Sequence, residues 1–470
     1  MGGCMSHLPA SCLWQGALPA VAPSSLPPVA EECDVAIIGA GYTGLWTAYY
    51  LKRQDPALHV QVFEAAHAGF GASGRNGGWL IGGIAGQDAW LASLDEDARE
   101  ATRQLLYGIV DEVKTVCERE GIGCDLAHGG VLYAARGVAQ ARRARAWLTD
   151  LQRAGHTAAD FRWLSASELA AQLQIADGLG AVFSPHCATL HPLKLVQGLL
   201  HTVRRMGVRV HEACPVAGFG KGRVRLQGGE VRARWIVPAL EGASTTLPEL
   251  KGRVQPAQSL IVATEPLSAA QWDAIGLAGR AAFSDLSRGV TYGQRTADGR
   301  LLFGARGGYQ FAGRPRWDFD PQGDEFSLRT ELMRQFFPQL QDVRITHAWG
   351  GSLGLARGFT PFALRDRSRG VACAGGYGGE GVGASNLMGR TLADLICERE
   401  TLLTRQRWVE GEAGLSSLRR WEPEPLRYLG YHAIRSAFVL DDALADRQDI
   451  PARLRRLVGA GADALEGLMH

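Results

Sequence analysis

Three glycines and an acid near the start of the sequence have the clearest chemical meaning. Gly39, Gly41 and Gly44 form a Gly-x-Gly-x-x-Gly pattern, and Glu64 follows about twenty residues later. Such glycines allow a tight turn, bring the backbone close to a pyrophosphate and let a helix pack on a strand. Free N–H groups at the start of that helix bind phosphate, and the acid accepts hydrogen bonds from a ribose. The pattern therefore predicts a dinucleotide site.

The residues around this pattern favour the same interpretation. The pattern alone is weak evidence, because the chain contains 60 glycines and a glycine-rich loop without a ligand is the alternative. However, Val35–Ile38 is typical of a short buried strand, Leu45–Leu51 continues as a helix, and Glu64 ends a second strand, Val60–Phe63. A strand, a glycine turn, a helix and a second strand in this order are what a dinucleotide-binding unit requires.

A second glycine-rich loop, residues 69–78, comes just after this unit. Most of its side chains are small, so its backbone can lie against a large flat ligand, and its few polar side chains suit a phosphate and a ring edge. An ordinary surface loop is the alternative. Because a simple NAD-binding fold does not need this loop, we predict that the dinucleotide is FAD. The residues of this loop predicted to contact it are Gly71, Ser73, Arg75, Asn76, Gly77 and Gly78.

A third glycine-rich segment lies near the other end of the chain. A strand that begins near Val371 leads into Gly375-Gly-Tyr-Gly-Gly-Glu-Gly, and a helix is expected from Val382 to about Arg399. The N-terminus of such a helix stabilises negative charge, as a reduced flavin carries. Two glycine-opened helices far apart in sequence are thus predicted to bind the two ends of one FAD. Contacts are expected from Gly376, Tyr377, Gly379, Gly381 and Val382.

These segments together resemble the FAD-dependent amine and amino-acid oxidoreductases, the group that includes D-amino acid, glycine and monomeric sarcosine oxidases. Within the group the resemblance is greatest to gamma-glutamylputrescine oxidase-type enzymes, and it spans about Leu13 to Arg427. The motifs that carry it are Ile37–Gly44, Gly71–Gly78, Ser259–Pro266, Asp298–Gly304, Trp349–Gly351, Gly375–Val382 and Trp421–Arg427. The resemblance implies further cofactor contacts from Tyr42, Thr43, Ala65, Val216 and Gly351.

The resemblance also implies an α/β fold. A Rossmann-like FAD-binding domain is interleaved with a second, α+β substrate domain built on a mixed sheet. We expect the FAD-binding domain to comprise residues 33–86, 177–252 and 346–400, and the substrate domain residues 87–176 and 253–345. Residues 1–32 are expected to form an N-terminal arm. Residues 401–470 are expected to form a helical extension that caps a subunit or joins two copies of the chain.

The sequence departs from this family at two places. The strand Trp235–Pro238 is followed by Glu241 where relatives usually have Ala-Thr-Asn-Ala, which puts that cofactor contact in question. Glu380 stands in the last glycine loop where close relatives often carry His. An acid at that position favours a cationic substrate or acts as a base, and a solvated loop residue is the alternative. Some relatives bind flavin covalently through a Cys in the segment that is Gly351–Pro361 here, and this segment has none, so non-covalent FAD is expected.

Composition limits the partners and the location of the protein. A net charge of +2 with 46% hydrophobic and 21% charged residues describes an ordinary globular protein, with no case for a nucleic-acid partner. The nine cysteines form no zinc pattern, so no metal is expected, and they suggest a reducing cytoplasmic setting. No run approaches the ~20 apolar residues of a membrane span, and the first thirty residues lack the basic start of a signal peptide.

We therefore predict the oxidation of an amine or amino acid. Hydride equivalents pass to the flavin, the imine is hydrolysed to a carbonyl, and dioxygen is reduced to hydrogen peroxide. The residues predicted to act on the substrate are Tyr377, Glu380, Tyr292 and Arg306. Each has a structural alternative, as a core aromatic residue, a solvated acid or a surface cation. Two other functions remain open: a dehydrogenase that passes electrons to a quinone or carrier protein, and a flavin-bearing subunit without turnover.

Overall fold

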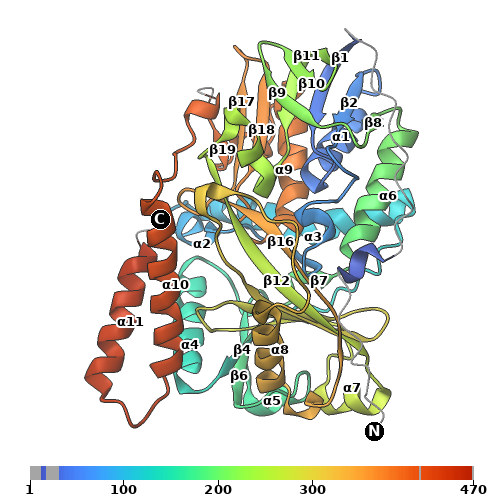
Figure 1. Cartoon of the computed structure of the whole chain (residues 1–470). Coiled ribbons are helices and arrows are strands. Elements are labelled where there is room, and N and C mark those ends of the chain that lie inside the picture. Colours follow the sequence, from blue (N-terminus) through green and yellow to red (C-terminus); the bar gives the residue numbers. More distant parts are fainter. Residues whose placement is uncertain (1–11, 17–30, 412–413, 468–470) are drawn as a thin grey trace.

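The structure is a computed structural model that describes residues 12–16, 31–411 and 414–467 (Figure 1). Its first sheet has nine strands and is centred on β1 (Glu31–Ile38), which pairs in parallel with β11 (Gly229–Pro238) and β2 (Val60–Phe63). The other strands are β8 (Arg209–His211), β9 (Val216–Gly220), β10 (Arg223–Leu226), β17 (Phe362–Asp366), β18 (Val371–Gly375) and β19 (Val409–Glu410). Since β18 runs parallel to β11, the carboxyl ends of β1, β2, β11 and β18 meet at one edge. Open α/β sheets bind ligands at such an edge.

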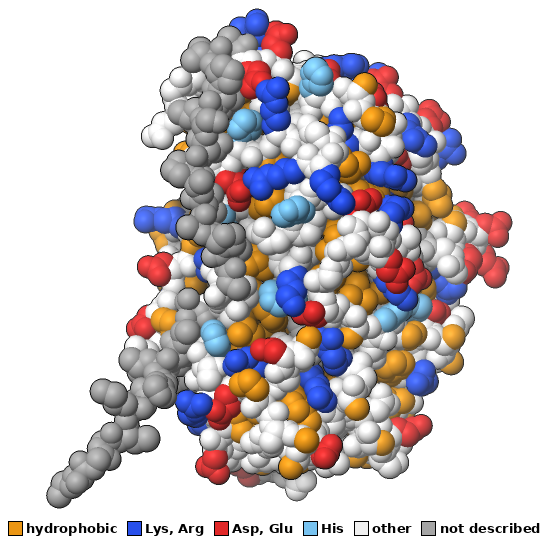
Figure 2. Space-filling model, turned by 90° about the vertical axis from the view of Figure 1, so that its right-hand side faces the viewer, with side chains coloured by type: hydrophobic (Ala, Val, Ile, Leu, Met, Phe, Trp, Pro, Cys, Tyr) orange, Lys and Arg blue, Asp and Glu red, His pale blue; other side chains and the backbone are white. Residues whose placement is uncertain are grey.

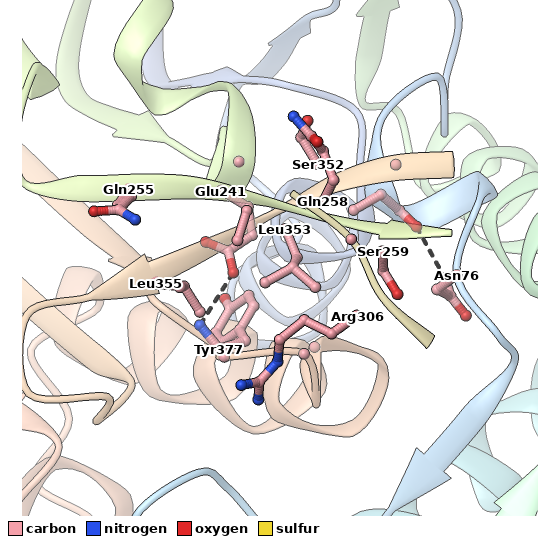
Figure 3. A pocket seen from close by; sticks show the side chains of 18 of the residues that line it. Asn76, Glu241, Gln255, Gln258, Ser259, Arg306, Ser352, Leu353, Leu355 and Tyr377 are labelled. Atoms are coloured by element: carbon pink, nitrogen blue, oxygen red, sulfur yellow. Dashed lines mark hydrogen bonds between the residues drawn. The ribbon is translucent and has the colours of Figure 1, made fainter. Parts of the chain in front are cut away.

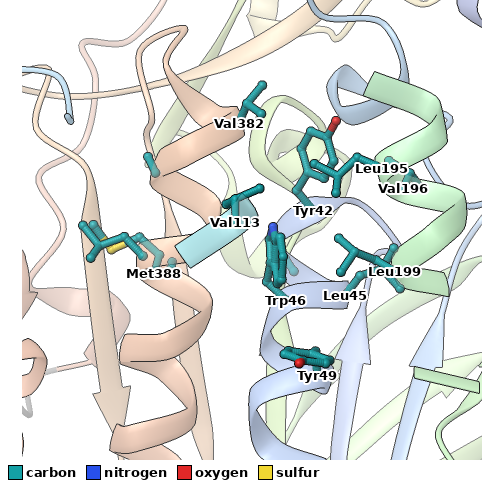
Figure 4. Packing of buried hydrophobic residues seen from close by; sticks show 14 of the residues in the cluster. Tyr42, Leu45, Trp46, Tyr49, Val113, Leu195, Val196, Leu199, Val382 and Met388 are labelled. Atoms are coloured by element: carbon teal, nitrogen blue, oxygen red, sulfur yellow. The ribbon is translucent and has the colours of Figure 1, made fainter. Parts of the chain in front are cut away.

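Successive side chains of β1 point to opposite faces of this sheet, and both faces are buried. Val35 and Ile37 belong to a core with the helices α1 (Tyr42–Gln54), α3 (Glu96–Glu120), α6 (Pro192–Arg205) and α9 (Gly381–Ile396). Ala36 and Ile38 face a second cluster that includes Phe219 of β9. Figure 4 shows Leu45 and Trp46 of α1, Leu199 of α6 and Met388 of α9 in the first core. Each such buried side chain contributes about 1.5–3 kcal/mol, which holds the glycine turn between β1 and α1 in place.

The second sheet has eight strands in the order β16 (Ile345–Ala356), β12 (Val254–Pro266), β15 (Arg300–Arg306), β14 (Thr291–Arg295), β13 (Ala282–Asp285), β4 (Val131–Arg136), β6 (Gly178–Ser184) and β5 (Arg162–Ser165). It is mixed, because β13 and β4 are parallel and the other neighbours are antiparallel. Helix α8 (Asp324–Phe336) buries Phe326 and Phe336 beneath β12 and β15. The other elements are α2 (Gln87–Leu91), α4 (Val138–Arg153), α5 (Ala166–Ala170), α7 (Ala269–Ile275) and the strand pair β3 (Trp79–Ile81) and β7 (Cys187–Thr189).

This architecture confirms the predicted α/β class and the mixed second sheet. Two strands lie in a different sheet from the one expected. The predicted ranges put β6 and β16 in the FAD-binding domain, whereas both strands pair in the second sheet. The pairing of β6 with β4, and of β16 with β12 along most of its length, decides this, and neither strand carries that information in its own sequence. Helix α9 also ends at Ile396, three residues before the expected Arg399. The domain boundaries as such stay a prediction.

The last part of the chain forms a helical hairpin of α10 (Leu426–Leu444) and α11 (Ala452–Gly467), drawn in red in Figure 1. Arg288 holds this hairpin to the second sheet through ion pairs with Asp441, Asp463 and Glu466. Arg143 of α4 adds a second pair, 3.4 Å from Asp441. That this segment joins two copies of the chain stays a prediction.

On the face drawn in Figure 2, acidic and basic side chains are interspersed. Among the described residues, no helix is long and apolar enough to cross a membrane. The same residues contain no group of three or more His, Cys, Asp or Glu side chains arranged to hold a metal ion.

Of the N-terminal arm, only Cys12–Gly16 and the first residues of β1 lie within the described range. Trp14 is buried, and its indole Nε1 donates to the carbonyl of Asn76 at 2.9 Å. Its ring meets that of Trp349 edge to face, with centroids 6.0 Å apart. This short segment therefore packs directly on the second glycine loop, as an arm lying on the domain does.

Candidate cofactor and substrate cavity

A cavity of about 1430 Å³ runs from the carboxyl edge of the first sheet, along the second sheet, to helix α10. Pockets for one drug-sized ligand have volumes of about 300–1,000 Å³, so this cavity is large enough for a dinucleotide and a substrate together. Figure 3 shows part of its lining, including Glu241, Tyr377, Ser259 and Arg306.

The first glycine turn has the geometry that a pyrophosphate site requires. Gly39 has a φ of +106°, and a Cβ there would lie 2.7 Å from the carbonyl oxygen of Ala239. A Cβ on Gly41 would lie 2.9 Å from Ser73 Oγ, which also accepts from the backbone N–H of Tyr42. At Gly44 a Cβ would lie 2.1 Å from the oxygen of Gly39, so only glycine lets α1 pack this closely on the turn. The bare backbone at the start of α1 fits a phosphate group.

Glu64 stands where the ribose contact was predicted, after β2 and on the cavity wall. In this structure its Oε2 accepts from the N–H of Ala40 at 2.9 Å, and its Oε1 from that of Ala66 at 3.0 Å. Burial raises the pKa of the Glu64 carboxyl, and these two backbone hydrogen bonds oppose the rise. The acid therefore also stabilises the first glycine turn, and its bond to a ribose stays a prediction.

The polar side chains of the second glycine loop bond mainly to protein carbonyls. Arg75 Nε donates to Phe70 O at 2.9 Å, and Asn76 Nδ2 donates to Ser73 O at 2.9 Å. Trp349 Nε1 in turn donates to the carbonyl of Arg75 at 2.9 Å. These bonds fix the shape of the loop, so the backbone and Ser73 are the parts of it best placed to contact a cofactor.

The structure brings most of the predicted site residues to this one cavity. The predicted cofactor contacts that line it are Gly39, Gly41, Tyr42, Thr43, Glu64, Ala65, Gly71, Ser73, Arg75, Asn76, Gly77, Val216, Gly351, Tyr377, Gly379, Gly381 and Val382. Gly44, Gly78 and Gly376 are not in its lining. Gly44 packs α1 on the glycine turn, Gly78 packs against Leu190, and Gly376 turns the chain after β18 with a φ of +77°.

The four predicted substrate residues also line the cavity, but two of them already have partners. The hydroxyl of Tyr377 is buried and lies 2.8 Å from that of Thr43 on α1. The hydroxyl of Tyr292 lies 2.6 Å from Ser259 Oγ on β12. The Tyr292 ring fills the space above Gly304, where a Cβ would lie 2.3 Å from it. Both tyrosines are held rigidly, so they shape the cavity wall.

Glu380 and Arg306, the other two, have no side-chain hydrogen bond or ion pair within the described part of the chain. Burial raises the pKa of the Glu380 carboxyl to about 7, and the nearby Asp88 adds to the rise. The surrounding protein lowers the pKa of the Arg306 guanidinium by desolvation. The side chain is nevertheless accessible to solvent, because it faces the cavity. A carboxyl group and a guanidinium cation, both without a bonded partner in the described part of the chain, can therefore interact with a bound ligand.

Sequence reasoning missed the role of Glu241. This buried acid begins a 3-10 helix (Glu241–Thr246) after β11, and its φ of 46° is unusual for a residue with a side chain. Its Oε2 accepts from the N–H of Gly376 and its Oε1 from that of Tyr377, both at 3.0 Å. The departure from the family at this position therefore does not remove the strand end from the cavity. Instead, the carboxyl links that strand end to the last glycine loop.

The second missed feature is the C-terminal hairpin. Its residues Leu426, Arg427, Gly430, Tyr431, Ala433, Ile434, Arg435, Phe438, Val439 and Leu465 line the cavity. A helical extension was expected over residues 401–470, but the sequence did not show which surface its helices cover. The ion pairs around Arg288 place it there, and they join residues more than 150 positions apart.

Glu241 makes the stability of the flavin-free protein depend on pH. Burial raises the pKa of its carboxyl from 4.5 to about 7, and backbone hydrogen bonds only partly oppose this rise. The folded protein thus keeps a proton that the unfolded chain releases near 4.5. The associated stability is complete below that pH and is lost as the pH rises through about 7. As the pH rises from about 5 to 8, we expect the free energy of unfolding to fall less for Glu241→Gln than for the parent protein, measured by urea unfolding.

The exposed Glu400 provides a matched control for this prediction. It pairs with Arg405 on the surface, and its side chain is 85% exposed. Glu400→Gln is expected to keep the parental dependence of stability on pH. Identical pH profiles for Glu241→Gln and the parent protein would contradict the role of the buried carboxyl.

Comparison with known proteins agrees with the geometry of the cavity. The family model described as "FAD dependent oxidoreductase" (DAO) matches residues 34–395. The chain therefore belongs to the DAO family of FAD-dependent oxidoreductases. Its cofactor is FAD, in agreement with the prediction, and the cavity has the glycine-lined backbone that FAD requires.

Individual relatives cover most of the chain. It is 29% identical to the probable oxidoreductase OrdL of Haemophilus influenzae, over 78% of this chain and 83% of that protein. It is also 29% identical to the gamma-glutamylputrescine oxidoreductase of Escherichia coli (strain K12), over 77% of this chain and 83% of that protein. The crystal structure of glycine oxidase from Geobacillus kaustophilus has the same fold, with a TM-score of 0.64 and 20% identity, covering 79% of this chain and 96% of that one.

Proposed function

We propose that the protein is an oxidase of primary or secondary amines or of amino acids. The substrate loses a hydride from its α-carbon and a proton from nitrogen, and water hydrolyses the resulting imine to a carbonyl compound. Dioxygen takes up the two electrons and two protons as hydrogen peroxide. One observation carries this proposal: a single cavity brings all three glycine-rich segments together with Glu380 and Arg306, whose side chains have no bonded partner among the described residues. The similarity to gamma-glutamylputrescine oxidoreductase and glycine oxidase supports it.

The residues of the chain have distinct tasks in this proposal. FAD, when bound without a covalent link, supplies the chemistry of accepting the hydride. The first two glycine loops would hold its phosphates, and the N-terminus of α9 would stabilise negative charge on its ring. The walls from Tyr292 and Tyr377 orient the amine and exclude water from it.

Glu380 is proposed to attract the ammonium form of the substrate and to accept its proton. Its carboxyl, with a pKa raised to about 7 by burial, is ionised at slightly alkaline pH and then attracts an ammonium group. Having no other partner, it can accept the proton that the ammonium group must lose before the α-carbon gives up hydride. A strong base is not required, because the amine reacts in its neutral form.

An anaerobic screen tests the proposed function. The flavin-loaded protein is mixed with gamma-glutamylated polyamines, N-methyl amino acids, aminophosphonates and free amino acids while the flavin absorbance is followed. We expect at least one class to bleach the flavin, and admitted air to restore the colour with one hydrogen peroxide formed for each carbonyl. Recovery with a quinone but not with air would identify a dehydrogenase instead. If none of the tested amines bleaches the flavin, the result favours a flavin-bearing subunit without turnover.

A further inference from the structure

Two buried thiols outside the cavity lie in contact with each other. Cys117 is in the last turn of α3, Cys124 is in the loop that follows this helix, and their sulfur atoms are 3.8 Å apart. Cys12, Cys187 and Cys373, by contrast, direct their thiols at backbone carbonyls. In the described part of the chain no other two thiols make such a contact, so this pair is the one positioned to react together.

The end of α3 places these two residues side by side. Gly121 has a φ of +69°, and the N–H of Ile122 donates to the carbonyl of Cys117 at 2.8 Å, which reverses the chain direction. Ile122 is buried in the first core. The carbonyl of Cys124 accepts from the N–H of His191, just before α6, at 2.8 Å. These contacts fix both ends of the turn, so the two thiols are held next to each other.

Only a thin turn separates the pair from solvent. Gly121 and Gly123 are exposed, and a Cβ on either glycine would meet no atom from another part of the protein within 4 Å. Cys117 retains an exposure of 6% and Cys124 of 2%. A molecule as small as hydrogen peroxide can therefore approach the sulfur atoms, whereas a larger reagent is excluded from them.

The two thiols differ in acidity. The hydrogen bond with Cys117 lowers the pKa of the Cys124 thiol; burial opposes this effect, and the backbone N–H of Leu126 supports it. The same hydrogen bond raises the pKa of the Cys117 thiol. The thiolate is the form of cysteine that reacts with peroxides. Cys124 is therefore the sulfur that reacts first, with Cys117 beside it as the second.

We propose that Cys117 and Cys124 form a reversible disulfide in reaction with hydrogen peroxide. The Cys124 thiolate attacks one peroxide oxygen, an S–O bond forms and the O–O bond breaks. The other oxygen leaves as hydroxide, which takes up the proton that the thiol released. Cys117 then attacks the resulting sulfenic acid, an S–S bond forms, the S–O bond breaks, and the oxygen leaves as water with the Cys117 proton. Two thiols are thus oxidised by two electrons, and one peroxide is reduced to two waters.

The pair keeps oxidation of the protein reversible. A sulfenic acid without a neighbouring thiol is oxidised further to sulfinic and sulfonic acids, which thiols do not reduce. A disulfide is ~2.05 Å long, so rotation of the two side chains has to bring the sulfur atoms closer by only about 1.8 Å. The proposed function would produce peroxide at this protein, but the thiol chemistry goes beyond that function and requires only that peroxide is present.

Peptide mapping tests the proposal with the flavin-loaded protein. Arg119 lies between the two cysteines, so trypsin separates them into residues 115–119 and 120–136. The protein is treated with hydrogen peroxide, and its remaining thiols are alkylated under denaturing conditions before digestion. We expect the two peptides to be recovered joined to each other, and separate after treatment with dithiothreitol. If they are separate and both cysteines are alkylated after peroxide treatment, the proposal is wrong.

Substitutions assign the two steps to the two sulfur atoms. Cys117→Ala removes the second thiol, so we expect peroxide to cause a loss of the Cys124 thiol that dithiothreitol does not reverse, whereas the parent recovers it fully. Cys397→Ala is the control, because this thiol lies at the end of α9 and contacts no other described thiol. It should give the same joined peptides as the parent. Equal recovery of Cys124 in Cys117→Ala and the parent would contradict the proposal, and mapping of the parent alone decides it if Cys117→Ala does not fold.

Added peroxide separates this inference from the proposed function. If no amine is oxidised but peroxide joins the two peptides, the disulfide stands and only the proposed oxidation is wrong. If amines are oxidised but added peroxide leaves the peptides separate, the oxidation stands and the disulfide inference is wrong.

Discussion

Gly44→Ala is expected to lose most of the FAD that the parent protein retains. The new Cβ would lie 2.1 Å from the backbone oxygen of Gly39, and a backbone atom cannot move aside as a flexible side chain can. Helix α1 must then shift away from the turn, at a cost of about 1–3 kcal/mol for overpacking. Because the start of this helix binds the cofactor phosphates, we expect FAD affinity to fall at least tenfold, or ~1.4 kcal/mol. Titration of the flavin-free protein with FAD measures this change.

Gly108→Ala is the matched control for this substitution. Gly108 lies in the interior of α3, and a Cβ there would have no atom of another part of the protein within 4 Å. Alanine favours a helix by about 1 kcal/mol over glycine, so this variant should be as stable as the parent or more so, with full FAD binding. Equal FAD affinity in both variants would mean that the close packing of α1 on the turn is unnecessary.

Arg288→Met is expected to release the C-terminal hairpin from the cavity. The Arg288 side chain is only 12% exposed, and it pairs with Asp441 at 2.6 Å, with Glu466 at 2.9 Å and with Asp463. Its guanidinium also lies 5.5 Å from the ring of Phe438. Removal leaves three acids close together, one of them buried, and breaking such a buried pair costs about 3–5 kcal/mol.

Hydrogen exchange measures this release. The two exposed acids reduce the loss, so we expect amide exchange in α10 and α11 to accelerate about a hundredfold, with little change in the two sheets. The KM for the amine should rise as well, because α10 forms part of the cavity wall. Arg447→Met removes a surface pair of 58% and 59% exposed side chains in the same hairpin, and its exchange should change about twofold at most. Unchanged exchange in Arg288→Met would show that other contacts hold the hairpin.

Local patterns allowed much of the fold and cofactor site to be predicted. The turn from β1 into α1 is specified by three glycines, since each position excludes a side chain for a separate steric reason. The strands Val35–Ile38 and Val60–Phe63 and the helix after the last glycine loop followed from short apolar runs and from glycine. These features depend on neighbours within a few residues, and such information is contained in the chain itself.

Contacts between distant segments could not be predicted in this way. The membership of β6 and β16 in the second sheet depends on their partners β4 and β12. The bonds of Glu241 to the last glycine loop join residues 135 and 136 positions apart. In the sequence this acid was visible only as a departure from the family, and its meaning was open.

The sequence by itself determined the FAD-binding class of this protein. A dinucleotide is bound mainly by backbone groups, and the glycines mark the positions where a side chain would block that contact. The tertiary structure alone decided what surrounds the substrate. Arg306, Arg329 and Arg435 are separated by long stretches of chain, and each is an ordinary charged residue in its own segment. Arg329 meets Arg306 where α8 packs on the second sheet, and the packing of the hairpin brings Arg435 to the same cavity. That packing depends on ion pairs between residues that no local pattern connects.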